Sequence, residues 1–164
     1  MLCSALGCQT CWKMQYKNSD ATNKQWSDQV VSIVSIGTTS APLSQFTIRY
    51  WFDADSQVPT GAACYSAPSS VGGCTKVTLN LVAVTPARPK ASYYLEIGFT
   101  SSAPTLAANS QTLDIQTAFH YASWANVDRT NDYSYDGTKT SLTDWSNVTL
   151  YNNGNKVWGN EPPP

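Results

Sequence analysis

Short runs of β-branched, aromatic and aliphatic residues recur along this chain and are separated by clusters of turn-forming residues. The runs lie at 12–17, 29–36, 45–52, 76–84, 92–100, 112–119, 148–151 and 156–158. The turn-forming clusters between them lie at 37–42, 59–73, 86–89 and 153–154, the last an Asn-Gly pair typical of a hairpin. No segment has a convincing helical period. Eight or nine short strands therefore predict an all-β fold, either a β-sandwich or a jelly roll.

Length and composition limit the chain to one domain with few classes of partner. Its 164 residues, 41% of them hydrophobic, suffice for a single domain with a real core. Only 13% of the residues are charged and the net charge is −1, which leaves no basic surface to hold nucleic acid or an anionic membrane. No segment approaches the ~20 apolar residues of a transmembrane helix. We expect neither nucleic acid nor membrane as a partner.

Five cysteines are more typical of a secreted β domain than of a cytosolic one. Cys64 and Cys74 bracket a loop rich in Gly, Ser and Pro, so we expect a disulfide between them. Cys8 and Cys11 have the spacing of a redox pair, but the βαβ context of such a site is missing. Because the total is odd, at least one cysteine is free or pairs outside this sequence. Together with the glycosylation sequon at Asn147, the pattern predicts a secreted protein.

The two ends of the chain differ in character from the strand-rich segment between them. Residues 1–11 contain three cysteines and precede the first predicted strand, so we expect an N-terminal extension there. Residues 162–164 are all proline, and a proline run cannot continue a sheet ladder but favours extended chain. We interpret 12–161 as the domain and 162–164 as the start of a linker to another domain. The alternative is an arbitrary proline-rich terminus.

The sequence lacks the residue sets that catalysis requires. His120 is the only histidine, and neither a GxSxG elbow nor a phosphate-binding loop accompanies it. Of the eleven acidic residues only two are glutamates, and one of these, Glu161, lies in the tail. This argues against the carboxylate pair of a glycosidase. We expect a protein that is not an enzyme.

Two loops concentrate oxygen-bearing side chains in a protein with few charges. Asp53 and Asp55 follow one predicted strand, and Asp128, Asn131 and Asp132 lie in a turn-like segment. Gathered carboxylates repel one another unless a cation lies between them. Oxygen ligands without histidine or thiol suit calcium better than zinc or copper. The pattern predicts a structural calcium ion, and the alternative is solvated turn aspartates, one of them capping its own loop.

Longer stretches of the chain resemble a known family. They are the segment 124–135 (Trp-Ala-Asn-Val-Asp-Arg-Thr-Asn-Asp-Tyr-Ser-Tyr), Asp144-Trp145, 156–162, the strands 48–52 and 92–100, and the opening 15–18. In order and spacing these stretches are similar to family 3 carbohydrate-binding modules, the cellulose-binding modules of cellulosomal scaffoldins and family 9 glycoside hydrolases. The resemblance covers roughly residues 12–162 and implies a nine-stranded jelly roll with a structural calcium ion. The family's calcium ligands fall on Asp53, Asp55, Asp128, Asn131 and Asp132. Asp53 and Asp128 stand where the family commonly has threonine, a change that calcium binding should survive. The alternative is that Asp53 or Asp128 contributes through its backbone carbonyl.

The resemblance also implies a planar strip of aromatic and polar side chains that stacks on glucose rings. Trp124 matches the tryptophan of this strip. The family's Asp-His pair aligns with Tyr65 and Ser66, and its arginine aligns near Ala118. We therefore expect Tyr65 and Tyr121 to rebuild part of the stacking surface.

Two further positions match polar residues that contact a neighbouring chain in the family, namely Gln116 and Asn23. The alternative is that each bonds the local backbone. For His120 we expect the side chain of a strand end and not a ligand.

These observations together describe a secreted, non-catalytic module that adsorbs to cellulose, an accessory to a cellulase or a wall protein beyond the proline tail. Because the strip lacks its arginine and its Asp-His pair, one alternative is a module that packs on a family 9 hydrolase and binds single glucan chains. Another alternative is a wall adhesion module for a different glycan.

Overall fold

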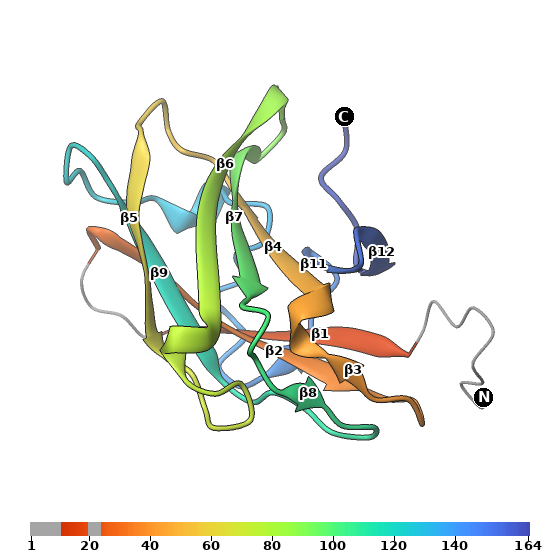
Figure 1. Ribbon diagram of the computed structural model, residues 1–164. Coiled ribbons are helices and arrows are strands. Elements are labelled where there is room, and N and C mark those ends of the chain that lie inside the picture. The colour runs from red at the N-terminus through yellow and green to blue at the C-terminus, as the bar shows by residue number, and fades with distance from the viewer. Residues whose placement is uncertain (1–10, 20–23) are drawn as a thin grey trace.

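The computed structural model describes residues 11–19 and 24–164, which form two antiparallel five-stranded sheets packed face to face (Figure 1). The first sheet has the order β10 (Thr143–Asp144), β1 (Trp12–Asn18), β2 (Trp26–Ser35), β9 (Ile115–Tyr121), β5 (Pro59–Ser66). The second sheet has the order β12 (Asn155–Trp158), β11 (Val148–Asn152), β4 (Phe46–Phe52), β7 (Ala91–Phe99), β6 (Val77–Arg88). A separate ribbon pairs β3 (Ala41–Pro42) with β8 (Thr105–Leu106). The expected all-β jelly-roll sandwich is confirmed.

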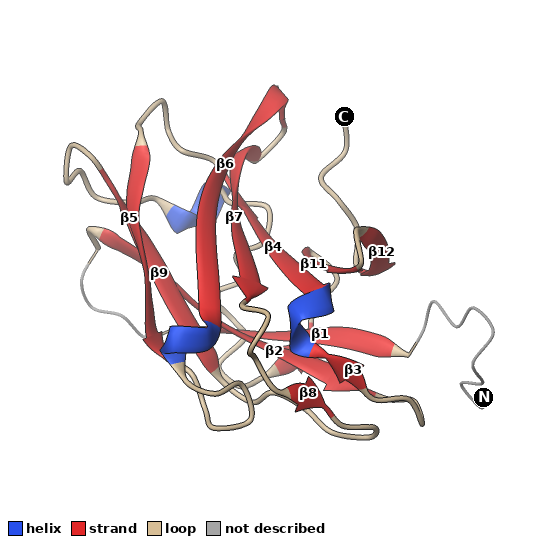
Figure 2. Cartoon of the chain, viewed as in Figure 1, coloured by secondary structure: helices blue, strands red, loops and turns tan. Residues whose placement is uncertain are grey.

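Helical structure in the described part of the chain is limited to three single turns of 3-10 helix (Figure 2). They are η1 (Leu43–Gln45), η2 (Cys74–Lys76) and η3 (Arg129–Asn131). Among these residues no helix is long and apolar enough to cross a membrane.

Alternate side chains of both sheets fill the space between them, as the pleat of a β-strand requires. In β7, Leu95 and Ile97 are fully buried, whereas Glu96 points outward and pairs with Arg49 of β4. Aromatic rings join the two sheets, because Phe52 of β4 stacks on Phe119 of β9 with ring centroids 4.2 Å apart. The outer face of each sheet is therefore made by the residues between these core positions.

The strand count exceeds the expected number of about nine because the chain also forms very short and glycine-containing strands. β3, β8 and β10 have two residues each, too few to leave a pattern in the sequence. β5 lies inside the segment expected to be loop, since Gly61 and the alanines beside it have low strand propensity. Its strand conformation comes from pairing with β9, through two irregularities of register.

A disulfide between Cys64 and Cys74 ties the end of β5 to η2. The expected extension at 1–11 lies outside the described residues except for Cys11, which is buried, and so do Cys3 and Cys8.

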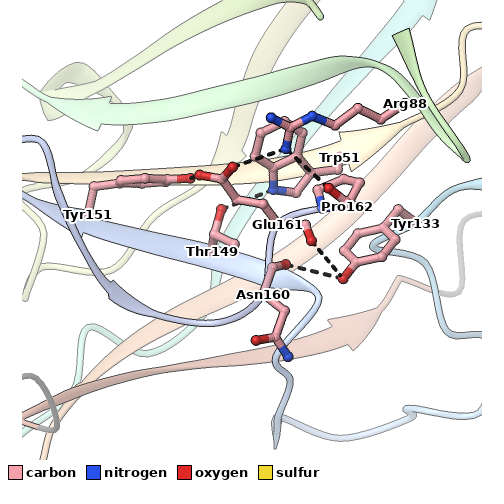
Figure 3. Close-up of polar contacts among 8 residues, drawn as sticks. All are labelled: Trp51, Arg88, Tyr133, Thr149, Tyr151, Asn160, Glu161 and Pro162. Atoms are coloured by element: carbon pink, nitrogen blue, oxygen red, sulfur yellow. Dashed lines mark hydrogen bonds and ion pairs between the residues drawn. The ribbon is translucent and has the colours of Figure 1, made fainter. Parts of the chain in front are cut away.

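Glu161 and Pro162, near the C-terminal end, pack on the outer face of the second sheet (Figure 3). Glu161 accepts hydrogen bonds from Arg88 of β6 at 3.0 Å and from Tyr151 of β11 at 2.7 Å. Arg88 also donates to the carbonyl of Pro162 at 3.1 Å, and Pro162 is buried. Beneath this tail Trp51 is only 3% exposed, although its neighbours Phe52 and Tyr50 occupy the core face. Pro162, expected to begin a linker, therefore packs on the domain.

Candidate functional site

Four rings form an aromatic platform on the outer face of the first sheet. They are Trp26 of β2, Tyr65 of β5, His120 of β9 and Trp124 in the loop after β9. Trp26 pairs with His120 across the sheet and meets the other three rings edge-on, at centroid distances of 5.8 Å to Tyr65, 4.6 Å to His120 and 5.7 Å to Trp124. Such edge-on packing is favourable and leaves little freedom for each ring. Tyr65 and Trp124 remain 51% and 48% exposed, so the platform is open to a ligand.

The indole of Trp124 lies flat on the imidazole of His120. Their ring centroids are 3.7 Å apart and their planes differ by 11°. His120 is buried, and its Nδ1 lies 2.8 Å from the carbonyl of Tyr121. Because a carbonyl only accepts, Nδ1 carries the proton and donates this bond. The bond fixes the plane of the imidazole and, through stacking, the plane of the indole.

The backbone around the platform is shaped to fit these two rings. Trp124 has a φ of +58°, and its carbonyl accepts a 2.7 Å hydrogen bond from Gln25. On the other side of the imidazole, Gly61 of β5 has a φ of +61°, and a Cβ at this position would lie 2.1 Å from Nε2 of His120. Only glycine fits here, both for its conformation and for the space that His120 occupies.

The platform continues into a polar region along the same face. Gln116 of β9 pairs with Val30 of β2, and both line a hollow of about 250 Å³. An ion pair between Lys17 and Asp114 forms another part of the hollow's wall. The face thus has aromatic rings at one end and hydrogen-bonding groups at the other, the combination that sugar recognition uses.

The structure brings three of the five residues expected to bind carbohydrate to this face, namely Trp124, Tyr65 and Gln116. Tyr121 is placed differently from the expectation. It is fully buried in the core, on the same side of β9 as Phe119, and a ring there cannot stack on a surface ligand. Asn23 lies outside the described residues.

Sequence reasoning missed Trp26 and gave His120 no part in the surface. The expected strand at 29–36 began three residues too late, because Trp26 through Asp28 already belong to β2. Extending the alternation to Trp26 would have placed it outward. The same alternation places His120 outward between Phe119 and Tyr121 of the core.

The acidic loops meet at the end of β4, where four of the five expected metal ligands lie together. Asp132 accepts a hydrogen bond from the backbone N–H of Asp53 at 3.0 Å. Asn131 donates to the carboxylate of Asp55 at 2.6 Å. The Asp128 side chain is separate from this cluster. Its exposed carboxylate accepts hydrogen bonds from the amide and hydroxyl of Thr130 within its own turn. These bonds lower the pKa of Asp128.

Two oxygens in this cluster are buried without a hydrogen-bond partner, Oδ1 of Asn131 and Oδ2 of Asp132. Burial raises the pKa of Asp132 well above its ordinary value, and the charges of Asp55 and Asp53 raise it further. In the part of the chain that the structure describes, no three His, Cys, Asp or Glu side chains converge on one point. The ligands available in this cluster are carboxylate and amide oxygens, two of which have no hydrogen-bond partner. Such oxygens fit a hard cation such as Ca²⁺.

Comparisons with known proteins agree on the family. The family model described as "Cellulose binding domain" matches residues 13–159. Endoglucanase A of Paenibacillus lautus is 35% identical over 152 residues, which are 91% of this chain and 21% of that enzyme. Exoglucanase-2 of Thermoclostridium stercorarium is 38% identical over 130 residues, 79% of this chain and 14% of that enzyme. The chain thus spans about a fifth or less of the length of these two relatives.

Solved structures give the same result. The CBM3b module of the scaffoldin ScaA from Acetivibrio cellulolyticus superposes with a TM-score of 0.85 at 29% identity, covering 95% of this chain and all of that one. A biomass-sensing module of an Rsgi-like protein from Clostridium thermocellum gives a TM-score of 0.84 at 25% identity, over 93% of this chain and 99% of that one. These modules are a non-catalytic domain type.

Proposed function

Because this chain belongs to the family of cellulose binding domains, we propose that it holds cellulose on the outer face of its first sheet, with Trp124 as the principal stacking ring. The observation that carries this proposal is the half-exposed indole of Trp124, held flat on the buried His120 within a cluster of four rings. Such a ring is rigid before the ligand arrives, so little conformational entropy is lost on binding.

The physical basis of adsorption is the burial of flat apolar surface. The faces of a glucose ring carry axial C–H groups, which pack against an aromatic ring and leave water. Tyr65 extends the stacking surface beyond Trp124, since both rings pack against Trp26 and both remain exposed. Gln116 and the hollow beside it supply polar groups for the sugar hydroxyls.

A calcium ion is the second part of the proposal. Asp53, Asp55, Asn131 and Asp132 would hold it, and Asp128 takes no part through its side chain. The support is chemical, because a cation at this point satisfies the two buried unpaired oxygens and offsets the charge of the buried Asp132 carboxylate. The ion would join the end of β4 to the loop that follows Trp124.

We place the module outside the cell, attached to a cellulose-degrading enzyme or a wall protein. The support is the identity of the relatives, which include an endoglucanase and an exoglucanase much longer than this chain. For the connection we propose the proline-rich linker expected to start within 162–164, where Pro163 and Pro164 are exposed.

The experiment that tests the function is a pull-down on a panel of insoluble polysaccharides, including microcrystalline cellulose, amorphous cellulose, chitin and xylan. Retention on both forms of cellulose supports the proposal. Retention on amorphous cellulose alone favours the alternative of single-chain binding. Retention on chitin or xylan, with none on cellulose, would contradict the proposal in favour of a module for another glycan.

A further inference from the structure

Asp28 lies in the outer face of the first sheet, between the aromatic platform and the polar hollow. It follows Trp26 by two residues in β2 and therefore points to the same side of the sheet. Across the sheet it pairs with Ala118, which pairs in turn with Ala63 of β5. The next row contains Gln116. Asp28, Ala118 and Ala63 thus form a row of small side chains beside the aromatic rings of the platform.

The Asp28 side chain is largely buried, and its carboxylate has no hydrogen-bond donor in the described part of the protein. Asp28 is only 6% exposed, and no donor among residues 11–19 and 24–164 bonds its side chain. Arg129 donates at 3.1 Å to the backbone carbonyl of Asp28 and not to its carboxylate. Its oxygens are not sealed from solvent, because they are absent from the buried unpaired atoms of the described chain.

Electrostatics agree with this placement. Burial raises the pKa of Asp28, and the charge of Arg129 offsets part of the effect. Burial also raises the pKa of Tyr65, and the nearby charge of Asp28 raises it further. The charge of the carboxylate therefore acts on an exposed ring of the platform. A buried charge without donors lowers stability, and such costs are typical of positions that serve a function.

We propose that the Asp28 carboxylate accepts hydrogen bonds from the hydroxyl groups of a glucan chain that lies on the platform. The inference rests on the proposed function, since it needs the chain stacked on Trp124 and Tyr65. A sugar ring lying flat on an aromatic side chain presents its hydroxyls at its edges, where a neighbouring carboxylate can accept them. An ionised carboxylate has two oxygens and can accept several hydrogen bonds. The hydroxyl groups of a glucan can donate these bonds, and each bond is strengthened by the charge of the carboxylate. Asp28 thus provides the fixed polar contact that stacking alone lacks.

Adsorption isotherms on microcrystalline cellulose test the inference with five proteins: the unmodified chain, Asp28→Asn, Asp28→Ala, Trp124→Ala and Glu96→Gln. Glu96→Gln is the matched control, because it removes the same charge from the outer face of the opposite sheet. We expect Asp28→Ala to weaken binding about tenfold, which corresponds to about 1.4 kcal/mol. Asp28→Asn should weaken it less, since an amide oxygen still accepts, and Glu96→Gln should bind like the unmodified chain.

Melting temperatures of the same proteins separate binding from folding. Because ionised Asp28 is buried without donors, Asp28→Asn should melt at the same temperature as the unmodified chain or higher, while its binding falls. A lower melting temperature would overturn the inference, since it would reveal a structural partner of the carboxylate. Equal binding by Asp28→Ala and the unmodified chain would also overturn it, and if Trp124→Ala still lost affinity the proposed function would stand. Undiminished binding by both Trp124→Ala and Asp28→Ala would overturn the inference and the proposed function together.

Discussion

The ring centroids of His120 and Trp124 lie 3.7 Å apart, with the rings nearly parallel. The buried imidazole thus supports one face of the half-exposed indole, and we call it the floor of Trp124. A tryptophan in a loop is free to adopt several rotamers, and a ligand that stacks on it must select one. The floor removes most of this freedom in advance, because His120 is itself held by the carbonyl of Tyr121. The stack therefore links the regular structure of β9 to the flat surface that we propose as the cellulose-binding face.

Gly61→Ala should weaken cellulose binding by moving His120. A methyl group at this position would lie 2.1 Å from Nε2, so the imidazole must shift and the floor under Trp124 tilts. The left-handed backbone adds a cost of about 1 kcal/mol in stability. Gly154→Ala is the matched control, because its φ of +78° carries the same backbone cost with nothing within 4 Å of the added carbon. Equal binding by the two variants in a cellulose isotherm would argue against the role of His120.

Removal of calcium should lower the melting temperature, because the buried oxygens of Asn131 and Asp132 then lose their partner. Scanning calorimetry with EDTA, and again after calcium is restored, measures the change. Asp132→Asn should abolish the response to EDTA. Asp128→Asn should preserve it, since the Asp128 carboxylate bonds its own turn. An EDTA response lost in Asp128→Asn and retained in Asp132→Asn would contradict the assignment of ligands, and no response in the unmodified chain would exclude a structural calcium ion.

Glu161→Gln should lower the free energy of unfolding at neutral pH by about 1 kcal/mol. The hydrogen bonds from Tyr151 and Arg88 lower the pKa of Glu161 in the folded state. A lowered pKa stabilises the fold at pH values above the unfolded pKa, and this contribution is lost as pH falls through the folded pKa. Urea titrations at pH 7 and at pH 3 should therefore show a difference between the two proteins that shrinks in acid. A difference that is as large at pH 3 would show that Glu161 acts through packing and not through its charge.

The alternation of side chains along a strand predicted most of the fold. The runs at 45–52 and 92–100 contain β4 and β7 almost residue for residue. β5 was missed because its residues favour a loop locally, and only the long-range pairing with β9 makes them a strand. Such pairing leaves no trace in the sequence of β5 itself.

The candidate site was less predictable, for two physical reasons. The predicted strand at 112–119 stopped two residues early, so alternation was not applied to Tyr121, which β9 turns into the core. Asp128 lies near Asn131 and Asp132 in sequence, but its carboxylate accepts hydrogen bonds from the amide and the hydroxyl of Thr130 in its own turn. Local hydrogen bonds of this kind compete with a metal site and are not visible in spacing alone.

Adsorption of Trp124→Ala to microcrystalline cellulose tests the central claim most directly. Loss of one stacked ring face should cost about 2 kcal/mol of binding free energy, or about 30-fold in affinity. The matched control is Ile36→Ala, which truncates a side chain of the same 48% exposure just after the end of β2, at the end of that strand opposite to Trp26. We expect Trp124→Ala to lose this affinity with its melting temperature nearly unchanged, and Ile36→Ala to bind like the unmodified chain. Equal affinity of Trp124→Ala and the unmodified chain would contradict the account.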